Sequence, residues 1–261
     1  MKRFLVGTPA GNIASVARDI WNYLVTPREQ AGTLTNDQLA AFYVARICQP
    51  GSTFVDVGAH IGSVMSEVLR YCPSVAIVAI EPIPDKALHL RRKFRSAEVH
   101  NCALSDRDGE VAFYVDQINS AYSALAPSGE HSVAITVKQN RLDQIVTNGV
   151  DVVKIDVEGA ELGVLRGAEK LIANCRPTIM FESGPGEVLG YTKAQLFDWF
   201  ADHHYLLFVP NRLPHDGLPL SFHGFLEAHC YPFRTLNYFA VASERISEVR
   251  ARAAMCKFSR W

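Results

Sequence analysis

The chain has 261 residues, of which 48% are hydrophobic and 20% are charged, and its formal net charge at pH 7 is −1. This length and balance are typical of one sizeable α/β domain with extensions, without a signature of disorder. A nearly neutral chain has no overall positive field to hold a nucleic-acid backbone, so we expect no nucleic-acid partner. No apolar run approaches the roughly 20 residues that span a bilayer, so we expect no membrane span.

The six cysteines are scattered, without the Cys-x-x-Cys pairs that are typical of zinc sites. Several lie within apolar runs, where a cysteine is usually a small buried residue, and this fits a reducing compartment. The apolar stretch at the N-terminus is interrupted by Gly7, Pro9 and Gly11 before the core of a signal peptide accumulates. We therefore expect a cytoplasmic location.

Residues 1–50 are predicted to form a helical extension or cap, in which Thr35 and Gln38 have the spacing of a capping box. From residue 51 onward, strand-like and helix-like runs alternate, and several strand-like runs are almost continuously apolar. Such runs are typical of a mostly parallel sheet that is covered on both faces by helices, a doubly wound α/β fold. The predicted strands are 54–57, 75–80, 99–104, 152–156 and 178–182, and the predicted helices are 64–69, 87–94, 161–173 and 194–201.

The rhythm changes after residue 104. A turn at 105–109 precedes apolar runs at 111–115 and 133–137, which predict a small β insertion. Two later runs, 205–209 and 238–241, resemble closing strands, and the segment between them is expected to be a long loop where a substrate lid could lie. The predicted organisation is therefore an extension (1–50), a main domain (51–245) and a C-terminal tail helix (246–261).

A glycine-containing loop, 56–62, follows the first predicted strand. Its glycines permit a sharp turn that brings the backbone close to a nucleotide-like ligand, although glycines alone also fit a turn without a ligand. Asp56 would repel the pyrophosphate of a dinucleotide and attract the amino and sulfonium groups of S-adenosylmethionine. Glu81 ends the next strand, where a carboxylate accepts hydrogen bonds from ribose hydroxyls. These features favour a phosphate-free adenosine cofactor bound by Asp56, Gly58, His60, Gly62 and Glu81.

The end of the third predicted strand contributes Ala103, Leu104 and Ser105 to the adenine side of this crevice. Ordinary packing at a strand end explains these three residues equally well.

A charged run follows the strand 152–156. Because side chains alternate along a strand, Lys154, Asp156 and, if the extended conformation continues, Glu158 point to one side. Buried charges need mutual pairing or a ligand, and pairing of Lys154 with Asp156 or Glu182 is one alternative. Asp156 and Glu182 each end a strand beside the predicted crevice, which favours a functional role, whereas Glu161 is expected to serve the start of the next helix.

Three stretches of the sequence resemble the FkbM-type methyltransferases: Phe-Val-Asp-Val-Gly-Ala-His-Ile-Gly at 54–62, Ile-Glu-Pro at 80–82 and Lys-Ile-Asp-Val-Glu-Gly-Ala-Glu at 154–161. The resemblance covers 53–182 and continues at 237–241. It implies a class I, Rossmann-like methyltransferase fold with a seven-stranded sheet, S-adenosylmethionine as cofactor, and O-methylation. His60 stands where the family more often has Asn, and it either hydrogen-bonds the carboxylate of the cofactor or stacks within the turn.

A hydroxyl is a poor nucleophile while it is protonated, so its methylation needs a base or a metal ion. Asp156 is predicted to lie beside the transferable methyl group as base, and as cofactor-binding residue, with support from Glu158 and Glu182 and orientation by Lys154. Asp156 and Glu182 are also candidate ligands for a divalent ion such as Mg²⁺, which prefers oxygen ligands.

The expected acceptor is a small molecule or glycan, such as a hydroxyl of a sugar, a nucleotide-sugar or a polyketide, and a homo-oligomer is left open. The aromatic and histidine-rich stretch 203–225 would pack on a sugar ring or simply on the core. Two other functions compete. An NAD(P)-dependent oxidoreductase is disfavoured by the missing Gly-x-Gly-x-x-Gly spacing, and a non-catalytic binding module by the retained carboxylates.

Overall fold

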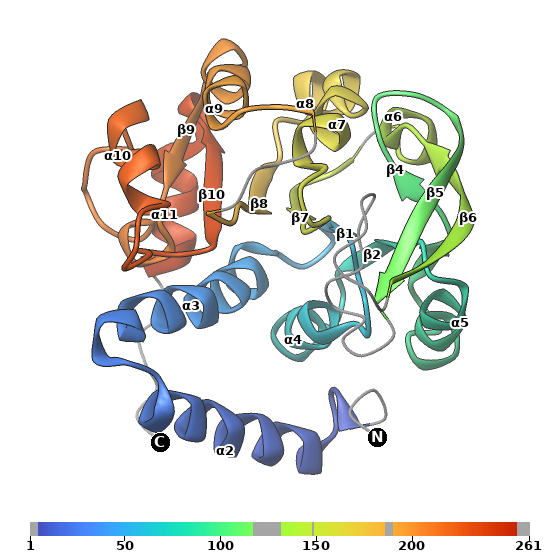
Figure 1. Cartoon of the computed structure of the whole chain (residues 1–261), viewed down its shortest axis with the longest axis horizontal. Helices are drawn as coiled ribbons and strands as arrows, with labels where there is room; N and C mark the ends of the chain where they lie inside the picture. Colours follow the sequence, from blue (N-terminus) through green and yellow to red (C-terminus); the bar gives the residue numbers. More distant parts are fainter. Residues whose placement is uncertain (1–4, 117–131, 148, 186–189, 255–261) are drawn as a thin grey trace.

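The computed structural model describes residues 5–116, 132–147, 149–185 and 190–254. The centre of the molecule is a seven-stranded sheet with the order β3-β2-β1-β7-β8-β10-β9 (Figure 1). β10 runs antiparallel to its two neighbours, whereas β1, β2, β3, β7 and β8 pair in parallel. The predicted Rossmann-like fold with a mostly parallel sheet is confirmed. The strands are β1 (Thr53–Val57), β2 (Ala76–Ile80), β3 (Glu98–His100), β7 (Val152–Ile155), β8 (Thr178–Glu182), β9 (Tyr205–Phe208) and β10 (Asn237–Ala242).

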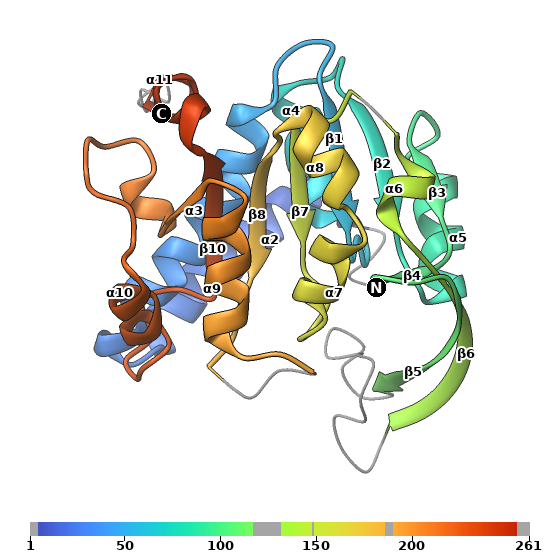
Figure 2. The ribbon, with the colours of Figure 1, turned by 90° about the horizontal axis from the view of Figure 1, so that it is seen from above.

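Helices cover both faces of this sheet (Figure 2). Alternate side chains of β1 explain this arrangement: Val55 and Val57 pack in one apolar core and Phe54 in the other. The core that contains Val55 is covered by α7 (Glu161–Arg166), α8 (Glu169–Cys175), α9 (Lys193–Asp202) and α10 (Phe222–Ala228). The core that contains Phe54 is covered by α3 (Ala31–Ile47), α4 (Ser63–Tyr71), α5 (Pro84–Lys93) and α11 (Ile246–Ala254). Short helices are α6 (Leu142–Ile145), η1 (Arg28–Gln30), η3 (Pro210–Arg212) and η4 (Ser243–Arg245).

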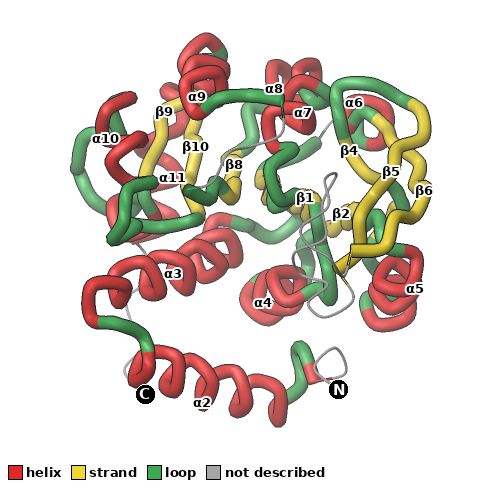
Figure 3. Tube along the Cα trace, in the orientation of Figure 1, coloured by secondary structure: helices red, strands yellow, loops and turns green. Residues whose placement is uncertain are grey.

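The predicted β insertion is a separate three-stranded sheet at one side of the molecule (Figure 3). Its strands are β4 (Ala103–Leu104), β5 (Gly109–Asp116) and β6 (Ser132–Asn140), in the order β4-β6-β5. The prediction of one strand over 99–104 was wrong, because the chain leaves the main sheet after His100 and enters the small sheet at Ala103. Asn101 stabilises this transition, since its side-chain amide donates to the carbonyls of Glu81 and Pro82, at 2.8 Å in each case.

Three local predictions need correction. α3 begins at Ala31, so Thr35 lies within the helix, where its hydroxyl donates to the carbonyl of Ala31 instead of capping. The helix predicted over 161–173 is two helices, because the chain bends at Gly167, where a Cβ atom would lie 2.0 Å from the carbonyl oxygen of Ser105. The expected loop between the closing strands contains α10, and its Phe225 is fully buried.

The helices outside the predicted main domain differ in their packing. α3 and α11 lie outside the predicted main domain, yet both contribute buried residues to the core of the sheet. α2 (Pro9–Val25) has no buried residue and lies away from the sheet (Figure 1). The boundaries at residues 51 and 245 stay a prediction, and residues 255–261 lie outside the described part. None of the helices described in the structure is long and apolar enough to cross a membrane.

Candidate active site

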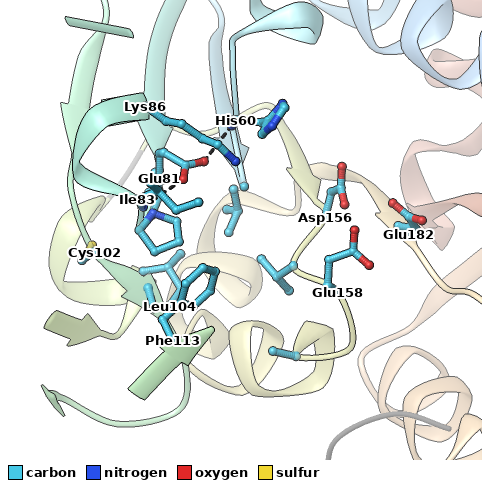
Figure 4. Close-up of a pocket in the computed structure, with 17 residues that line it drawn as sticks. His60, Glu81, Ile83, Lys86, Cys102, Leu104, Phe113, Asp156, Glu158 and Glu182 are labelled. Atoms are coloured by element: carbon cyan, nitrogen blue, oxygen red, sulfur yellow. Dashed lines mark hydrogen bonds between the residues drawn. The ribbon is translucent and has the colours of Figure 1, made fainter. Parts of the chain in front are cut away.

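A cavity of about 240 Å³ opens at the carboxyl ends of β1, β2, β7 and β8 (Figure 4). In parallel α/β sheets this edge is where ligands bind. Most of the predicted site residues line the cavity: Gly58, His60, Glu81, Ala103, Leu104, Asp156, Glu158 and Glu182. Four predicted residues do not line it: Asp56, Gly62, Ser105 and Lys154.

Glu81 lies at the end of β2 and is 3% exposed. Its two carboxylate oxygens accept hydrogen bonds from backbone N–H groups, one from His60 at 2.8 Å and one from Ile83 at 2.9 Å. Burial raises the pKa of Glu81 to about 7, against the lowering effect of Lys86 and of these hydrogen bonds. Each oxygen keeps a further lone pair, so the carboxylate is oriented to accept hydrogen bonds from two neighbouring hydroxyls.

The glycine loop uses its backbone donors inside the protein. The N–H groups of Gly58 and Ala59 both donate to the carbonyl of Ile80 at 3.0 Å, and that of Gly62 donates to Ala59 at 2.8 Å. The N–H group of His60 donates to Glu81. Dinucleotide-binding loops need such N–H groups for the pyrophosphate. Four of the five N–H groups at 58–62 are therefore engaged within the protein, which leaves this loop poorly suited to a pyrophosphate.

Gly58 and Gly62 are required for different reasons. Gly58 has a φ of +78°, and a Cβ atom there would lie 1.9 Å from the carbonyl oxygen of Asp156. Only glycine therefore lets the loop after β1 and the loop after β7, the two cavity loops, approach each other this closely. Gly62 has a φ of +79°, and a Cβ atom there would lie 2.3 Å from the ring of Phe94. Gly62 thus serves the packing of α4 against α5, away from the cavity.

His60 also has a left-handed backbone, with a φ of +52°. Asn and His adopt this conformation more readily than most other residues, so the backbone alone restricts the residue type here. The side chain lines the cavity on the side of the glycine loop. A role in binding the cofactor stays a prediction.

The end of the cavity beyond Glu81 is apolar. Ile83, Leu104 and Phe113 form its wall, the last from β5 of the insertion (Figure 4). Phe113 was missed at the sequence level, because nothing in a β hairpin indicates which side chain reaches another sheet. Lys86 was also missed, although a lysine in the first turn of α5 is unfavourable toward the helix dipole and was a usable signal. Ser105 lies outside this wall and contacts α7 near Gly163 instead.

The opposite end of the cavity is acidic, and its carboxyl groups are interlocked. Buried Lys154 lies 3.0 Å from Asp56 and 3.3 Å from Asp156, and donates to the carbonyl of Gly58 at 2.9 Å. Asp56 and Lys154 are direct neighbours in the pairing of β1 with β7. The expected contact of Asp56 with a ligand is therefore replaced by an ion pair beneath the cavity, and Lys154 positions the carboxylates without facing the cavity.

Asp156 and Glu182 share a hydrogen bond at this end. Burial alone would raise the pKa of Asp156, but Lys154 and the hydrogen bond with Glu182 outweigh it and hold the pKa below its usual range. Burial and the nearby charge of Asp156 raise the pKa of Glu182 well above its usual range. Asp156 is thus the ionised member, and Glu182 is a neutral carboxyl that donates to it.

Glu158 differs from both members of this pair. β7 ends at Ile155, so the strand alternation predicted to reach Glu158 stops, and Glu158 has a left-handed backbone with a φ of +52°. A long side chain in this conformation is uncommon; it occurs at functional sites and also at helix ends, as at Arg176 after α8. Within the described residues, no donor hydrogen-bonds to its half-buried carboxyl, which lines the cavity. Burial, followed by repulsion from Asp156 and Glu161, raises the pKa of Glu158 to about 7.

Glu161 has the structural role that was expected. Its carboxylate accepts a hydrogen bond from the N–H group of Gly159 at 2.9 Å and another from the hydroxyl of Tyr191. These contacts hold the start of α7 and the loop that carries Glu158.

The predicted Mg²⁺ site is not supported by the donor set. Among the described residues, no group of three or more His, Cys, Asp or Glu side chains is arranged to hold a metal ion. Of the two candidate ligands only Asp156 is ionised, because Glu182 is held as a neutral acid, which is a weak metal ligand. We derive no step through a metal ion.

A family model described as the methyltransferase FkbM domain matches residues 56–208. The chain belongs to this family. The match includes the whole glycine loop, 56–62, and the carboxyl groups at the ends of β7 and β8. The resemblance seen in the sequence motifs is confirmed.

The matched part of the chain spans about three fifths of the length of two similar proteins. The chain is 29% identical over 146 residues to Methyltransferase 1 of Beauveria bassiana (strain ARSEF 2860), which covers 45% of this chain and 59% of that protein. The structure of this chain is similar to that of the methyltransferase FkbM from Methylobacillus flagellatus KT. The TM-score is 0.49 and the identity 15%, over 87% of this chain and 60% of the other. A magnesium protoporphyrin IX methyltransferase from Synechocystis PCC 6803, with S-adenosylmethionine bound, gives a TM-score of 0.43 and 12% identity, covering 80% and 78%.

Proposed function

We propose that the protein transfers the methyl group of S-adenosylmethionine to a hydroxyl of a small molecule or glycan. The observation that carries the proposal is that two backbone donors hold the carboxyl of Glu81, while the glycine loop beside it uses the N–H groups of Gly58, Ala59 and Gly62 within the protein. This combination fits a ribose without phosphates and disfavours NAD(P). The FkbM family membership supports methyl transfer.

The residues present fit the cofactor along the length of the cavity. Glu81 would accept hydrogen bonds from the ribose hydroxyls, and the apolar wall of Ile83, Leu104 and Phe113 would pack on adenine. The bound cofactor supplies an electrophilic methyl group on a cationic sulfur. The protein then has to align the acceptor and remove its proton.

Glu158 fits the role of proton acceptor better than Asp156, the residue favoured by the sequence. The carboxylate of Asp156 is engaged by Lys154 and Glu182, which lower its basicity. Glu158 is free of such partners among the described residues, and a base with a pKa near 7 is well matched to neutral solution. Such an unengaged, ionisable group also favours an enzyme over a non-catalytic binding module.

The test is a calorimetric comparison of S-adenosylmethionine, S-adenosylhomocysteine and NAD. We expect binding of the first two and none of NAD. Glu81→Ala should weaken both by about 1.5–3 kcal/mol per lost charge-assisted hydrogen bond. Binding of NAD alone would instead support an oxidoreductase. Release of S-adenosylhomocysteine in the presence of panels of sugars and other hydroxyl compounds then identifies the acceptor.

A further inference from the structure

Asp156 is the carboxylate at the acidic end of the cavity that is paired with Lys154. Its side chain is 33% exposed, whereas that of Lys154 behind it is 6% exposed. Lys154 directs its ammonium group toward Asp56, Asp156 and the carbonyl of Gly58, all beneath the cavity wall. The cavity therefore meets a negative charge whose balancing positive charge is turned away from it.

The position of the cofactor sulfur follows from the two ends of the cavity, and this step rests on the proposed function. With the ribose at Glu81 and adenine on the apolar wall, the 5′ substituent would extend toward the rest of the lining, which includes Gly58 and His60 of the glycine loop and Asp156, Glu158 and Glu182 at the acidic end (Figure 4). The sulfur is attached directly to the 5′ carbon of the ribose. It would therefore lie at the end of the cavity where Asp156 presents its charge.

We propose that the carboxylate of Asp156 attracts the positively charged sulfur of the cofactor. The protein therefore binds S-adenosylmethionine, with its cationic sulfur, more tightly than S-adenosylhomocysteine, whose sulfur is neutral. During transfer, the acceptor oxygen forms a bond to the methyl carbon, the electron pair of the broken carbon–sulfur bond stays on sulfur, and the acceptor proton passes to Glu158. The sulfur is then uncharged, and its attraction to Asp156 is lost. The contact favours loading of the donor and release of the product, not the chemical step.

The contacts with Lys154 and Glu182 explain why Asp156 keeps its charge in a half-buried place. Lys154 and the neutral carboxyl of Glu182 both stabilise the ionised form. Glu158 lies near the same end and would add a variable charge, because its pKa is about 7. At pH 6 Glu158 is mostly protonated, and so is Glu81, whose pKa is also about 7 but whose ribose contact is common to both ligands, so a difference between the ligands reports on Asp156.

The experiment is calorimetry at pH 6 with S-adenosylmethionine and S-adenosylhomocysteine on the unmodified protein and on Asp156→Asn. We expect the unmodified protein to prefer the methylated cofactor by about tenfold or more, a difference of about 1.4 kcal/mol. Asp156→Asn should reduce this preference to about twofold or less, mainly by weakening the binding of S-adenosylmethionine.

Two further variants serve as matched controls. Glu81→Gln changes the ribose contact, which both ligands share, so it should weaken both and leave their ratio unchanged. Glu182→Gln keeps a side-chain N–H donor toward Asp156 and should also retain the preference. If Glu182→Gln removed the preference as fully as Asp156→Asn, the attracting charge would belong to Glu182 and the proposal would be overturned.

The unmodified protein provides a second test if Asp156→Asn does not fold. Sinefungin has an amino-bearing carbon in place of the methylated sulfur and is cationic when its amine is protonated, so it should bind more tightly than S-adenosylhomocysteine. Equal affinity for all three ligands, or a preference that survives in folded Asp156→Asn, would overturn the inference alone. Failure to bind any of them would overturn the proposed function itself.

Discussion

The two ends of the cavity hold their carboxyl groups in different ways. At the ribose end, Glu81 is held by the backbone N–H groups of His60 and Ile83. At the acidic end, the carboxyl groups are held by other side chains. Lys154 forms ion pairs with Asp56 and Asp156, and Glu182 hydrogen-bonds with Asp156. A carboxylate held by the backbone depends on loop conformation, whereas a carboxylate held by side chains depends on the identity of each partner. Substitutions should therefore affect the two ends differently.

Replacement of Lys154, at the acidic end, should have the largest effect on stability. Lys154→Met leaves Asp56 and Asp156 without their counter-charge, which should lower the free energy of unfolding by about 3–5 kcal/mol. Urea unfolding measures this change. Exposed Lys138 on β6 is the control, and its replacement by Met should change stability by about 0.5 kcal/mol or less. Equal stability of the two variants would contradict a buried ion pair.

Gly58→Ala should disturb both ends at once, because Gly58 lets the two cavity loops approach. A methyl group there overlaps the carbonyl of Asp156, and the backbone is left-handed. We expect a loss of about 2–4 kcal/mol in unfolding free energy. Gly51 has a similar φ of +80° but nothing within 4 Å of a Cβ atom, so Gly51→Ala should cost only about 1 kcal/mol. A smaller loss at Gly58 than at Gly51 would show that the loops can separate freely.

Glu158→Gln should separate catalysis, at the acidic end of the cavity, from cofactor binding, at the ribose end. We expect the methyl-transfer rate to fall about 100-fold or more, with the affinity for S-adenosylhomocysteine retained, because the proton acceptor is removed. In the unmodified protein, the rate should rise as pH increases through about 7, the pKa of Glu158. Rates measured with the acceptor found by screening test both statements. Exposed Glu110 is the control, and full activity of Glu158→Gln would assign the base to another group.

The raised pKa values predict how stability depends on pH. In the folded protein, Glu81 and Glu158 each have a pKa of about 7, above the ordinary value of 4.5, so the folded state holds protons that the unfolded state has lost. Their contribution to stability is complete below pH 4.5 and is lost as pH rises to about 7. Each carboxyl should lower the unfolding free energy by at most about 1.4 kcal/mol per pH unit in this range.

Denaturant unfolding from pH 5 to 8 measures this slope. Glu81→Gln and Glu158→Gln should each flatten it, because each removes one of the titrating groups. A slope unchanged in both variants would place the titrating groups elsewhere.

Much of the fold was predictable because its signals are local. The strand at 178–182 was predicted with the bounds of β8, and the glycine loop was placed between a strand and a helix. Predictions were wrong where a distant contact decided the outcome. The third strand ends early because the chain moves to a second sheet, and the helix after Glu161 bends where Gly167 meets Ser105.

The sequence predicted which residues form the candidate site better than it predicted their roles. The sequence identified Glu81, Asp156, Glu158 and Glu182, which all line the cavity. It did not indicate that Asp56 lies beneath the wall. Nor did it indicate that Phe113 reaches the cavity from the insertion, since that depends on how the small sheet packs against the large one.

By itself, the sequence determined the order of strands, loops and helices, the placement of acidic residues at strand ends, and the family. These features depend on residue spacing and on backbone preferences over a few positions. Only the tertiary structure decided which carboxyl is paired, which is neutral and which is free. Asp56 and Lys154 become partners because β1 lies next to β7, and Glu158 stays free because its backbone turns away from the strand. Charge state in a buried site is set by neighbours across the sheet, so no local pattern in the chain could decide it.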